Sequence, residues 1–341
     1  VFPFFMFIMG ISMYFSLYKS NFVLSIPVAK KIVKRTLILI LLGISLEWFS
    51  WFCYYWTIAP ANLSFIKNVM VSIIDCWSLR LSGVLQRLAI SYGVAAFGVF
   101  LIRHRFIPYL IGGLLTVYTI ILWCGNGFAY DETNILSWVD YKVLTANHMY
   151  GDHGIDPEGV LSTLPSIAHV LLGFWIGHYL VNKDFKISRQ LLFQSQMLTL
   201  FMWGVVFTFS GFLLSYGCPI NKKIWSPTFV LVSCGMGCSL LALLLWLVDM
   251  KGYRKGCLFF ESFGVNPLFC YVTASALAIV CATPFFSFQG KPICIRNVFY
   301  EQVLQPVFGN YGGSFLYAIG FVLLNWCIGY LLYRRRVFIK L

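Results

Sequence analysis

The chain has 341 residues, of which 60% are hydrophobic and only 11% are charged, and its mean hydropathy is +0.80. Soluble domains are roughly 45–50% apolar and about 25% charged, which excludes a water-soluble globular protein; disorder is excluded because it requires low hydrophobicity. The net charge of +13 does not indicate a nucleic-acid partner, because the basic residues form short clusters between long apolar runs. An integral membrane protein remains.

Nine apolar runs follow one another along the chain, each near the roughly 20 residues that a helix needs to cross about 30 Å of hydrocarbon. They cover residues 1–18, 36–58, 84–102, 107–124, 160–181, 192–216, 227–249, 257–283 and 314–333. We therefore predict an all-α fold, a polytopic transmembrane helix bundle of about nine spans in a single domain over residues 1–341. Residues 62–83 are interpreted as a shallow interfacial helix.

The loops between these runs differ in charge. One alternating set of loops carries 17 Lys and Arg residues and the other carries seven, while six acidic residues lie in the segment 125–159 of the second set. Because Lys and Arg concentrate in cytoplasmic loops, the first set and the C-terminus are predicted to be cytoplasmic and Val1 to lie at the outer face. Val1 opens directly in an apolar run without an initiator Met, so we expect the true N-terminus to lie upstream.

The eleven cysteines lie mostly inside the apolar runs and form no CxxC pair. They are interpreted as small buried hydrophobes, and no metal site is predicted. Whether Cys218 and Cys294 pair is left open by the sequence.

Arg87 begins the third span about one turn inside its outer end. An ionisable residue at bilayer depth costs about 2.5–3.5 kcal/mol on insertion scales, which makes it a functional candidate. Two interpretations stay open. In one, Arg87 snorkels to the interface; in the other it faces the bundle interior and binds a carboxylate or an anionic substrate with its forked guanidinium.

Asp156 and Glu158 precede the fifth span, where the helix dipole favours negative charge. Capping alone is one interpretation. In the other, Glu158, Ser162 and His169 share one face of the helix and form a polar stripe that runs inward, as in a solvated groove. His169 taken alone is interpreted as a hydrogen-bonded core histidine.

Two further features carry polar chemistry. His148 and His153 lie in the acidic outer loop, where a neutral imidazole can take a proton from an attacking amine or hydroxyl, although loop histidines are commonly only solvated. Asn266 precedes Pro267 in the eighth span, which predicts a kink whose freed carbonyls Asn266 would satisfy.

Seven segments spread along the chain carry a family resemblance. They are VFPFFMFIMG at 1–10, GVLQRL at 83–88, NHMYG at 147–151, DPEGVLST at 156–163, NKKIWSPTF at 221–229, GVNPL at 264–268 and YRRRVFIKL at 333–341. In this order and at similar spacing they resemble the heparan-α-glucosaminide N-acetyltransferase family and its bacterial relatives. The resemblance covers nearly the whole chain, and seven ordered motifs are more specific than any single one.

The resemblance implies a transmembrane N-acetyltransferase that moves an acetyl group from cytoplasmic acetyl-CoA to an extracytoplasmic amino sugar or glycan. It also implies a multi-pass protein of the bacterial inner membrane, or of the lysosomal membrane for the animal relatives. The expected partners are membrane lipid, acetyl-CoA, the amino sugar or glycan acceptor and, in a homodimer, a second copy of the chain; nucleic acid is not expected. Basic clusters at 251–255 and 334–336 could neutralise donor phosphates, although the orientation bias already explains them.

By matched position, the resemblance implies a substrate-binding wall formed by Gln86, Arg87, Asp156, Asn221, Trp225, Ser226 and Asn266. The family's catalytic histidine lies in an outer loop just before the segment that matches Val1, so none is assigned inside this chain, which would be catalytically incomplete. His148 and Glu158 are the catalytic candidates within it. The alternative function is a transporter or flippase of a small glycan or lipid-linked sugar, with Arg87, Glu158 and His169 lining its path.

Overall fold

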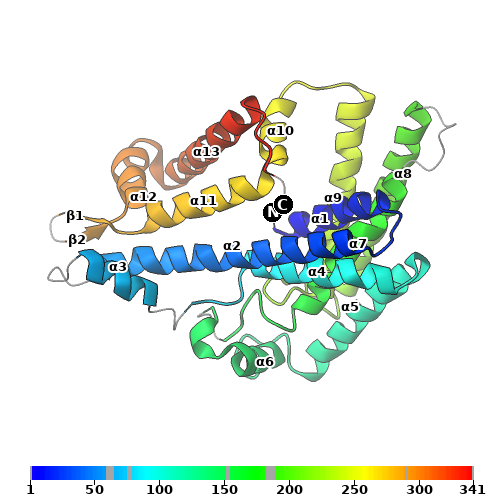
Figure 1. Cartoon of the computed structure of the whole chain (residues 1–341), viewed down its shortest axis with the longest axis horizontal. Coiled ribbons are helices and arrows are strands. Elements are labelled where there is room, and N and C mark those ends of the chain that lie inside the picture. The colour runs from blue at the N-terminus through cyan, green and yellow to red at the C-terminus, as the bar shows by residue number, and fades with distance from the viewer. Residues whose placement is uncertain are drawn as a thin grey trace. The chain divides into compact units, whose positions relative to one another are not determined.

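The computed structural model describes residues 2–58, 65–74, 79–150, 154–181, 189–288 and 291–339, which are almost entirely helical (Figure 1). The helices are α1 (Phe2–Tyr18), α2 (Ile26–Ile58), α3 (Phe65–Ile74), α4 (Val84–Leu101), α5 (Ile107–Cys124), α6 (Ile135–Leu144), α7 (Thr163–Leu180), α8 (Arg189–Leu214), α9 (Pro227–Leu244), α10 (Cys257–Val265), α11 (Pro267–Ala282), α12 (Ile295–Asn297) and α13 (Gln305–Arg334). The strands β1 (Phe286–Phe288) and β2 (Lys291–Ile293) pair antiparallel, with Phe286 opposite Ile293. The predicted helical fold class is confirmed.

Fewer helices than expected qualify as membrane spans. Among the described residues, six are long and apolar enough: Ile26–Thr57, Val84–Leu101, His104–Cys124, Gln190–Leu214, Pro227–Met250 and Ile295–Arg334. The bent pair α10 and α11 would add a seventh. The expected count of about nine is therefore not supported. Helix α1 has only 17 residues, and α7 carries His169 and His178 within its 18 residues, which makes it less apolar.

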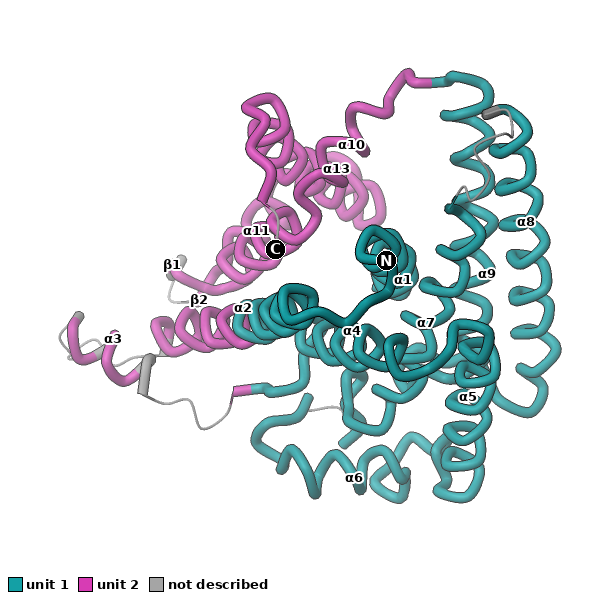
Figure 2. The backbone as a smooth tube through the Cα atoms, turned by 45° about the vertical axis from the view of Figure 1, so that its right-hand side comes forward, with its two compact units in different colours: residues 1–43, 80–253 teal, residues 44–79, 254–341 magenta. Residues whose placement is uncertain are grey.

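Contacts between residues group the chain into two compact units (Figure 2). Unit 1 comprises Val1–Gly43 and Arg80–Tyr253, and unit 2 comprises Ile44–Leu79 and Arg254–Leu341. Helix α2 contributes its first part to unit 1 and its remainder to unit 2. The expectation of a single domain stays a prediction.

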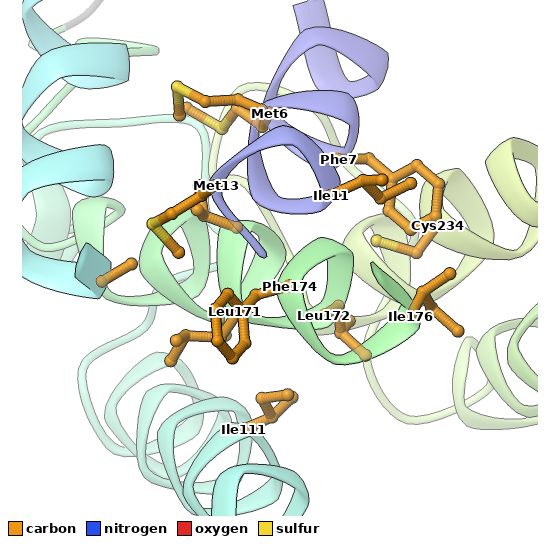
Figure 3. Close-up of a cluster of buried hydrophobic side chains, with 14 of the residues drawn as sticks. Met6, Phe7, Ile11, Met13, Ile111, Leu171, Leu172, Phe174, Ile176 and Cys234 are labelled. Atoms are coloured by element: carbon orange, nitrogen blue, oxygen red, sulfur yellow. The ribbon is translucent and has the colours of Figure 1, made fainter. Parts of the chain in front are cut away.

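Helix α7 is the central helix of unit 1, because α1, α4, α5, α8 and α9 all pack against it. Buried apolar side chains fill these contacts, among them Phe7 and Met13 of α1, Ile111 of α5, and Leu172 and Phe174 of α7 (Figure 3). Because other helices of the protein surround α7, its two histidines do not prevent it from lying at the centre of unit 1.

Two glycines bring the backbones of α1 and α7 close together. A Cβ atom added at Gly10 would lie 2.7 Å from the Phe174 nitrogen and 2.9 Å from the Gly173 Cα atom. Small residues at helix crossings allow such close approach in membrane proteins. The contact between α1 and α7 therefore depends on glycine at both positions.

The connections of unit 1 gather at its two ends. At one end, the rings of Phe22 and His104 are 4.3 Å apart, and the Tyr14 hydroxyl forms a 3.0 Å hydrogen bond with Nδ1 of His178. At the other end, Trp123 donates its indole N–H to the Gly217 carbonyl at 3.0 Å. Loops that the charge pattern assigned to one side thus contact one another.

In unit 2, α10 and α11 meet at an angle of 88° at Asn266 and Pro267, which confirms the predicted kink. Asn266 is buried and does not serve the carbonyls of its own span, so that expectation is wrong. Its amide donates to the Val337 carbonyl at 2.8 Å, and its carbonyl oxygen accepts the Ile339 N–H at 2.8 Å. The side chain ties the bend to a segment far along the sequence.

Candidate functional site

Arg87 is almost completely buried, with 2% of its surface exposed, in the first turn of α4. Its guanidinium donates to the carbonyls of Pro157 at 2.7 Å and Gly159 at 3.2 Å, and to the Ser162 hydroxyl. Its Cζ atom also lies 5.0 Å from the ring centre of Trp225, a cation–π contact. The geometry supports the interpretation in which Arg87 faces the bundle interior.

The segment before α7 is a series of turns rather than the first turns of the helix. The Gly159 N–H donates to the Asp156 carbonyl at 3.0 Å, and α7 begins only at Thr163. Residues 157–159 therefore lie outside the helix, and the Arg87 guanidinium binds the backbone carbonyls of Pro157 and Gly159. The prediction that Glu158 shares a helical face with Ser162 and His169 is therefore wrong.

Asp156 is the centre of a hydrogen-bonded cluster on these turns. Its carboxylate accepts two bonds from Arg80, at 2.6 and 3.3 Å, and one from the Ser82 hydroxyl at 2.5 Å. The backbone N–H groups of Tyr150 and Glu158 add bonds of 3.0 and 2.8 Å. The sequence singled out Asp156 but not its partner Arg80, which lies three residues before the GVLQRL motif on the side poor in basic residues.

Arg80 also binds Glu158, at 2.6 Å from its guanidinium to the carboxylate, so that one cation holds two acids. Burial by itself would raise the pKa of Asp156, but its bonds to Arg80, Ser82 and the Glu158 N–H hold that pKa below the usual range. Burial would likewise lower the pKa of Arg80, and the two carboxylates raise it instead. Both partners are therefore charged at neutral pH.

Asp140 on α6 is a second buried acid that the sequence did not single out. Its Oδ1 accepts the Val160 N–H at 2.8 Å, whereas its Oδ2 has no hydrogen-bond partner among the described residues. Burial raises its pKa to about 6, an effect opposed by the Val160 bond and by the charge of Arg87 and reinforced by the charge of Asp156. This carboxyl group changes charge close to neutral pH.

The indole of Trp225 lies against the Arg87 guanidinium, and Trp225 is 1% exposed. It has a positive φ of 51°, a conformation that bulky residues rarely adopt. Its ring lies 5.2 Å from that of Phe2 and 6.0 Å from that of His169. The strained backbone places the indole between the beginning of α1 and the middle of α7.

Several buried nitrogen atoms of the candidate residues lack a hydrogen-bond partner among the described residues. They are Nε2 of Gln86, Nε of Arg87 and Nε1 of Trp225. A buried polar atom without a partner costs about 1–3 kcal/mol. His169 is fully buried, and its interpretation as a hydrogen-bonded core histidine stays a prediction. The unpaired nitrogen atoms suit the polar groups of a ligand.

Ser226, Asn221 and His148 border this cluster in unit 1, whereas two other candidates are not part of it. Ser226 begins α9 and accepts the N–H groups of Asn221 at 3.0 Å and Phe229 at 3.3 Å, a helix-capping role. His148 is half-buried, and its carbonyl accepts the Leu81 N–H at 3.2 Å. Asn266 belongs to unit 2, and His153 lies outside the described residues.

Unit 1 therefore brings together Gln86, Arg87, Asp156, Glu158 and Trp225, which come from three separate stretches of the chain. We call these five residues together with Arg80 and His169 the polar site.

No family model matches the chain. It is similar to heparan-alpha-glucosaminide N-acetyltransferase of Mus musculus, with 25% identity over 397 aligned positions that cover 100% of this chain and 54% of the mouse protein. It is also similar to the protein of the same name from Homo sapiens, with 26% identity over 219 positions that cover 60% of this chain and 29% of the human protein.

The chain thus spans about half the length of the mouse relative. Its helices mark a multi-pass membrane protein. It is a distant homologue of heparan-alpha-glucosaminide N-acetyltransferase, and this homology supports a transferase role in general.

Proposed function

We propose that this protein is a transmembrane acetyltransferase that moves the acetyl group of acetyl-CoA to the amine of an amino sugar or glycan on the opposite side of the membrane. The observation that carries the proposal is the buried polar site, where Arg87 lies over Trp225 among nitrogen atoms without partners. A charged residue at this depth is retained at a cost, which favours a functional role. The similarity to the mouse acetyltransferase along the whole chain points to acetyl transfer.

The chemistry of acetyl transfer fits the groups that the polar site offers. When an amine attacks a thioester carbonyl, negative charge develops on the carbonyl oxygen and the amine loses a proton. As the carbonyl re-forms, the C–S bond breaks and coenzyme A leaves as a thiolate, which takes up a proton to become the free thiol. The unpaired donors Nε of Arg87 and Nε1 of Trp225 would bind that oxygen, and preorganised donors in a water-poor site stabilise such a charge strongly. Glu158 and His148 stand as candidates to accept the proton, and Arg80 orients Glu158.

The charge of the loops gives the proposal its direction. The turn after α1 and the connection of α4 to α5 carry Lys19 and Arg103 at one end of unit 1, which we assign to the cytoplasm together with the C-terminus. The acidic turns around Asp156, which contribute two residues to the polar site, lie at the other end. The donor would therefore enter from the cytoplasm, and the sugar would meet the site from outside.

The test is an acetylation assay with the full-length protein in detergent, using acetyl-CoA labelled in its acetyl group and glucosamine as acceptor. We expect labelled N-acetylglucosamine, and we expect R87K to lose about 100-fold or more of the rate because Lys cannot reproduce the guanidinium fork. The matched control R105K changes an exposed arginine at the opposite end of unit 1 and should retain the wild-type rate.

Two outcomes would count against acetyl transfer at this site. Equal rates for R87K and the wild type would remove Arg87 from the reaction centre. Passage of unmodified sugar into proteoliposomes, with no acetylated product, would show transport instead.

A further inference from the structure

A groove of about 520 Å³ lies in unit 1 between the second half of α1, the turn that follows it, the beginning of α2 and the middle of α4. Its polar lining consists of Ser12, Ser16, Lys19, Ser20, Lys31 and Tyr92. Apolar side chains, including Phe15 and Ile32, complete its wall. The groove is separate from the polar site, which lies at the opposite end of α1.

The groove is positively charged. Lys31 donates to the Ser16 hydroxyl at 3.4 Å, and the guanidinium carbon of Arg35 lies 4.6 Å from the ring centre of Tyr92. No Asp or Glu occurs in residues 1–46, and among the described residues neither Lys19 nor Lys31 forms an ion pair. A cleft lined by charge of one sign focuses the electric field and concentrates counter-ions.

Lysine ammonium groups and serine hydroxyls together are typical phosphate ligands. The apolar part of the wall adds room for a hydrocarbon portion of the same molecule. We propose that this groove binds the phosphate groups of an anionic ligand that also carries an apolar arm. Resting on the proposed function, we assign that ligand as acetyl-CoA, with its diphosphate between Lys19 and Lys31. A phospholipid headgroup shares this chemistry, and the experiment below distinguishes it from acetyl-CoA.

The position of the groove along α1 agrees with this assignment. Ser16 lines the groove, and Phe2 near the other end of the same helix packs on Trp225 of the polar site. A helix rises 1.5 Å per residue, so the two positions are about 21 Å apart along the helix axis. That span is comparable with an extended pantetheine arm, which separates the thioester of acetyl-CoA from its phosphates.

The experiment compares two double variants of the full chain in nanodiscs of phosphatidylcholine. In K19Q/K31Q both lysines of the groove lose their charge. In the control K30Q/K34Q the same change in net charge falls on lysines of α2 that do not line the groove. Calorimetry with coenzyme A as the probe should show affinity at least about tenfold weaker for K19Q/K31Q, because each lysine loses a charge-assisted contact. The control should stay within about twofold of the wild type.

Equal affinities of both double variants for coenzyme A and for soluble dioctanoyl phosphatidylglycerol would overturn the phosphate site. Weakened binding of the lipid probe alone would uphold a phosphate site and overturn its assignment to the donor. Thermal unfolding of both variants verifies that they fold.

The acetylation assay separates this inference from the proposed function. We expect K19Q/K31Q to raise the KM for acetyl-CoA while kcat is retained. If the wild type acetylates glucosamine and the variant leaves this KM unchanged, the groove assignment fails and the function stands. If the wild type binds coenzyme A through the groove without acetyl transfer, the groove stands and the function fails.

Discussion

Replacement of Arg87 by Met removes the guanidinium and keeps a side chain of similar length. Three acceptors then lose their donor: the carbonyls of Pro157 and Gly159 and the Ser162 hydroxyl. Each bond to a charged group contributes about 1.5–3 kcal/mol, but bonds made by one group do not add fully. Because three buried acceptors lose a charged donor without the losses adding fully, we expect R87M to lower the free energy of unfolding by about 3–5 kcal/mol.

The measurement is reversible unfolding in mixed micelles, followed by circular dichroism as the fraction of denaturing detergent rises. R87K should lose less, about 2–3 kcal/mol, because an ammonium group reaches fewer of the acceptors than the fork does. The exposed Arg105 provides the control, since R105M should remain within about 0.5 kcal/mol of the wild type. A loss below about 1 kcal/mol for R87M would refute the view that Arg87 holds the turns before α7.

Three further changes test other parts of unit 1. D156N should lower the unfolding midpoint at pH 7 and differ less from the wild type at pH 3, because the pKa of Asp156 is below its usual value and its contribution is lost as pH falls through that pKa. For Asp140, whose pKa is raised from 3.8 to about 6, the sign is opposite, and the wild type should lose stability as pH rises from about 4 to about 6. D140N should flatten this dependence of stability on pH. An unchanged slope in D140N would contradict the raised pKa of Asp140. G173L should separate α1 from α7, because a Cβ at Gly173 would lie 3.0 Å from the carbonyl carbon of Phe7. The expected result is faster cleavage by protease. G98L is the control, since a Cβ at Gly98 would meet no atom within 4 Å.

Most of the helices could be predicted from the sequence because the requirement is local. Apolar runs near 20 residues long recur wherever a helix is covered by lipid or by other helices, and each of the nine runs overlaps a helix, or the bent pair α10 and α11, over most of its described residues. What the runs do not reveal is which helix is surrounded by protein. Helix α7 illustrates this, since its packing against five other helices depends on contacts between distant stretches.

The residues of the polar site were in part predictable, and their partners were not. Arg87, Asp156 and Glu158 are conspicuous because charge is costly near the membrane. The pairing of Asp156 and Glu158 with Arg80 spans more than 70 residues, and no local pattern encodes it. The stacking of Arg87 on Trp225 depends likewise on an uncommon backbone conformation at Trp225.

The amide of Asn266 links the bend between α10 and α11 to residues 71 and 73 positions later in the chain. A ribosome delivers α10 and α11 well before it delivers Val337 and Ile339, and domains generally fold in the order of synthesis. During translation the two helices must therefore meet the bilayer without this anchor. The two bonds of the Asn266 amide form only once Ile339 has left the ribosome, which makes them a late step in the biogenesis of unit 2.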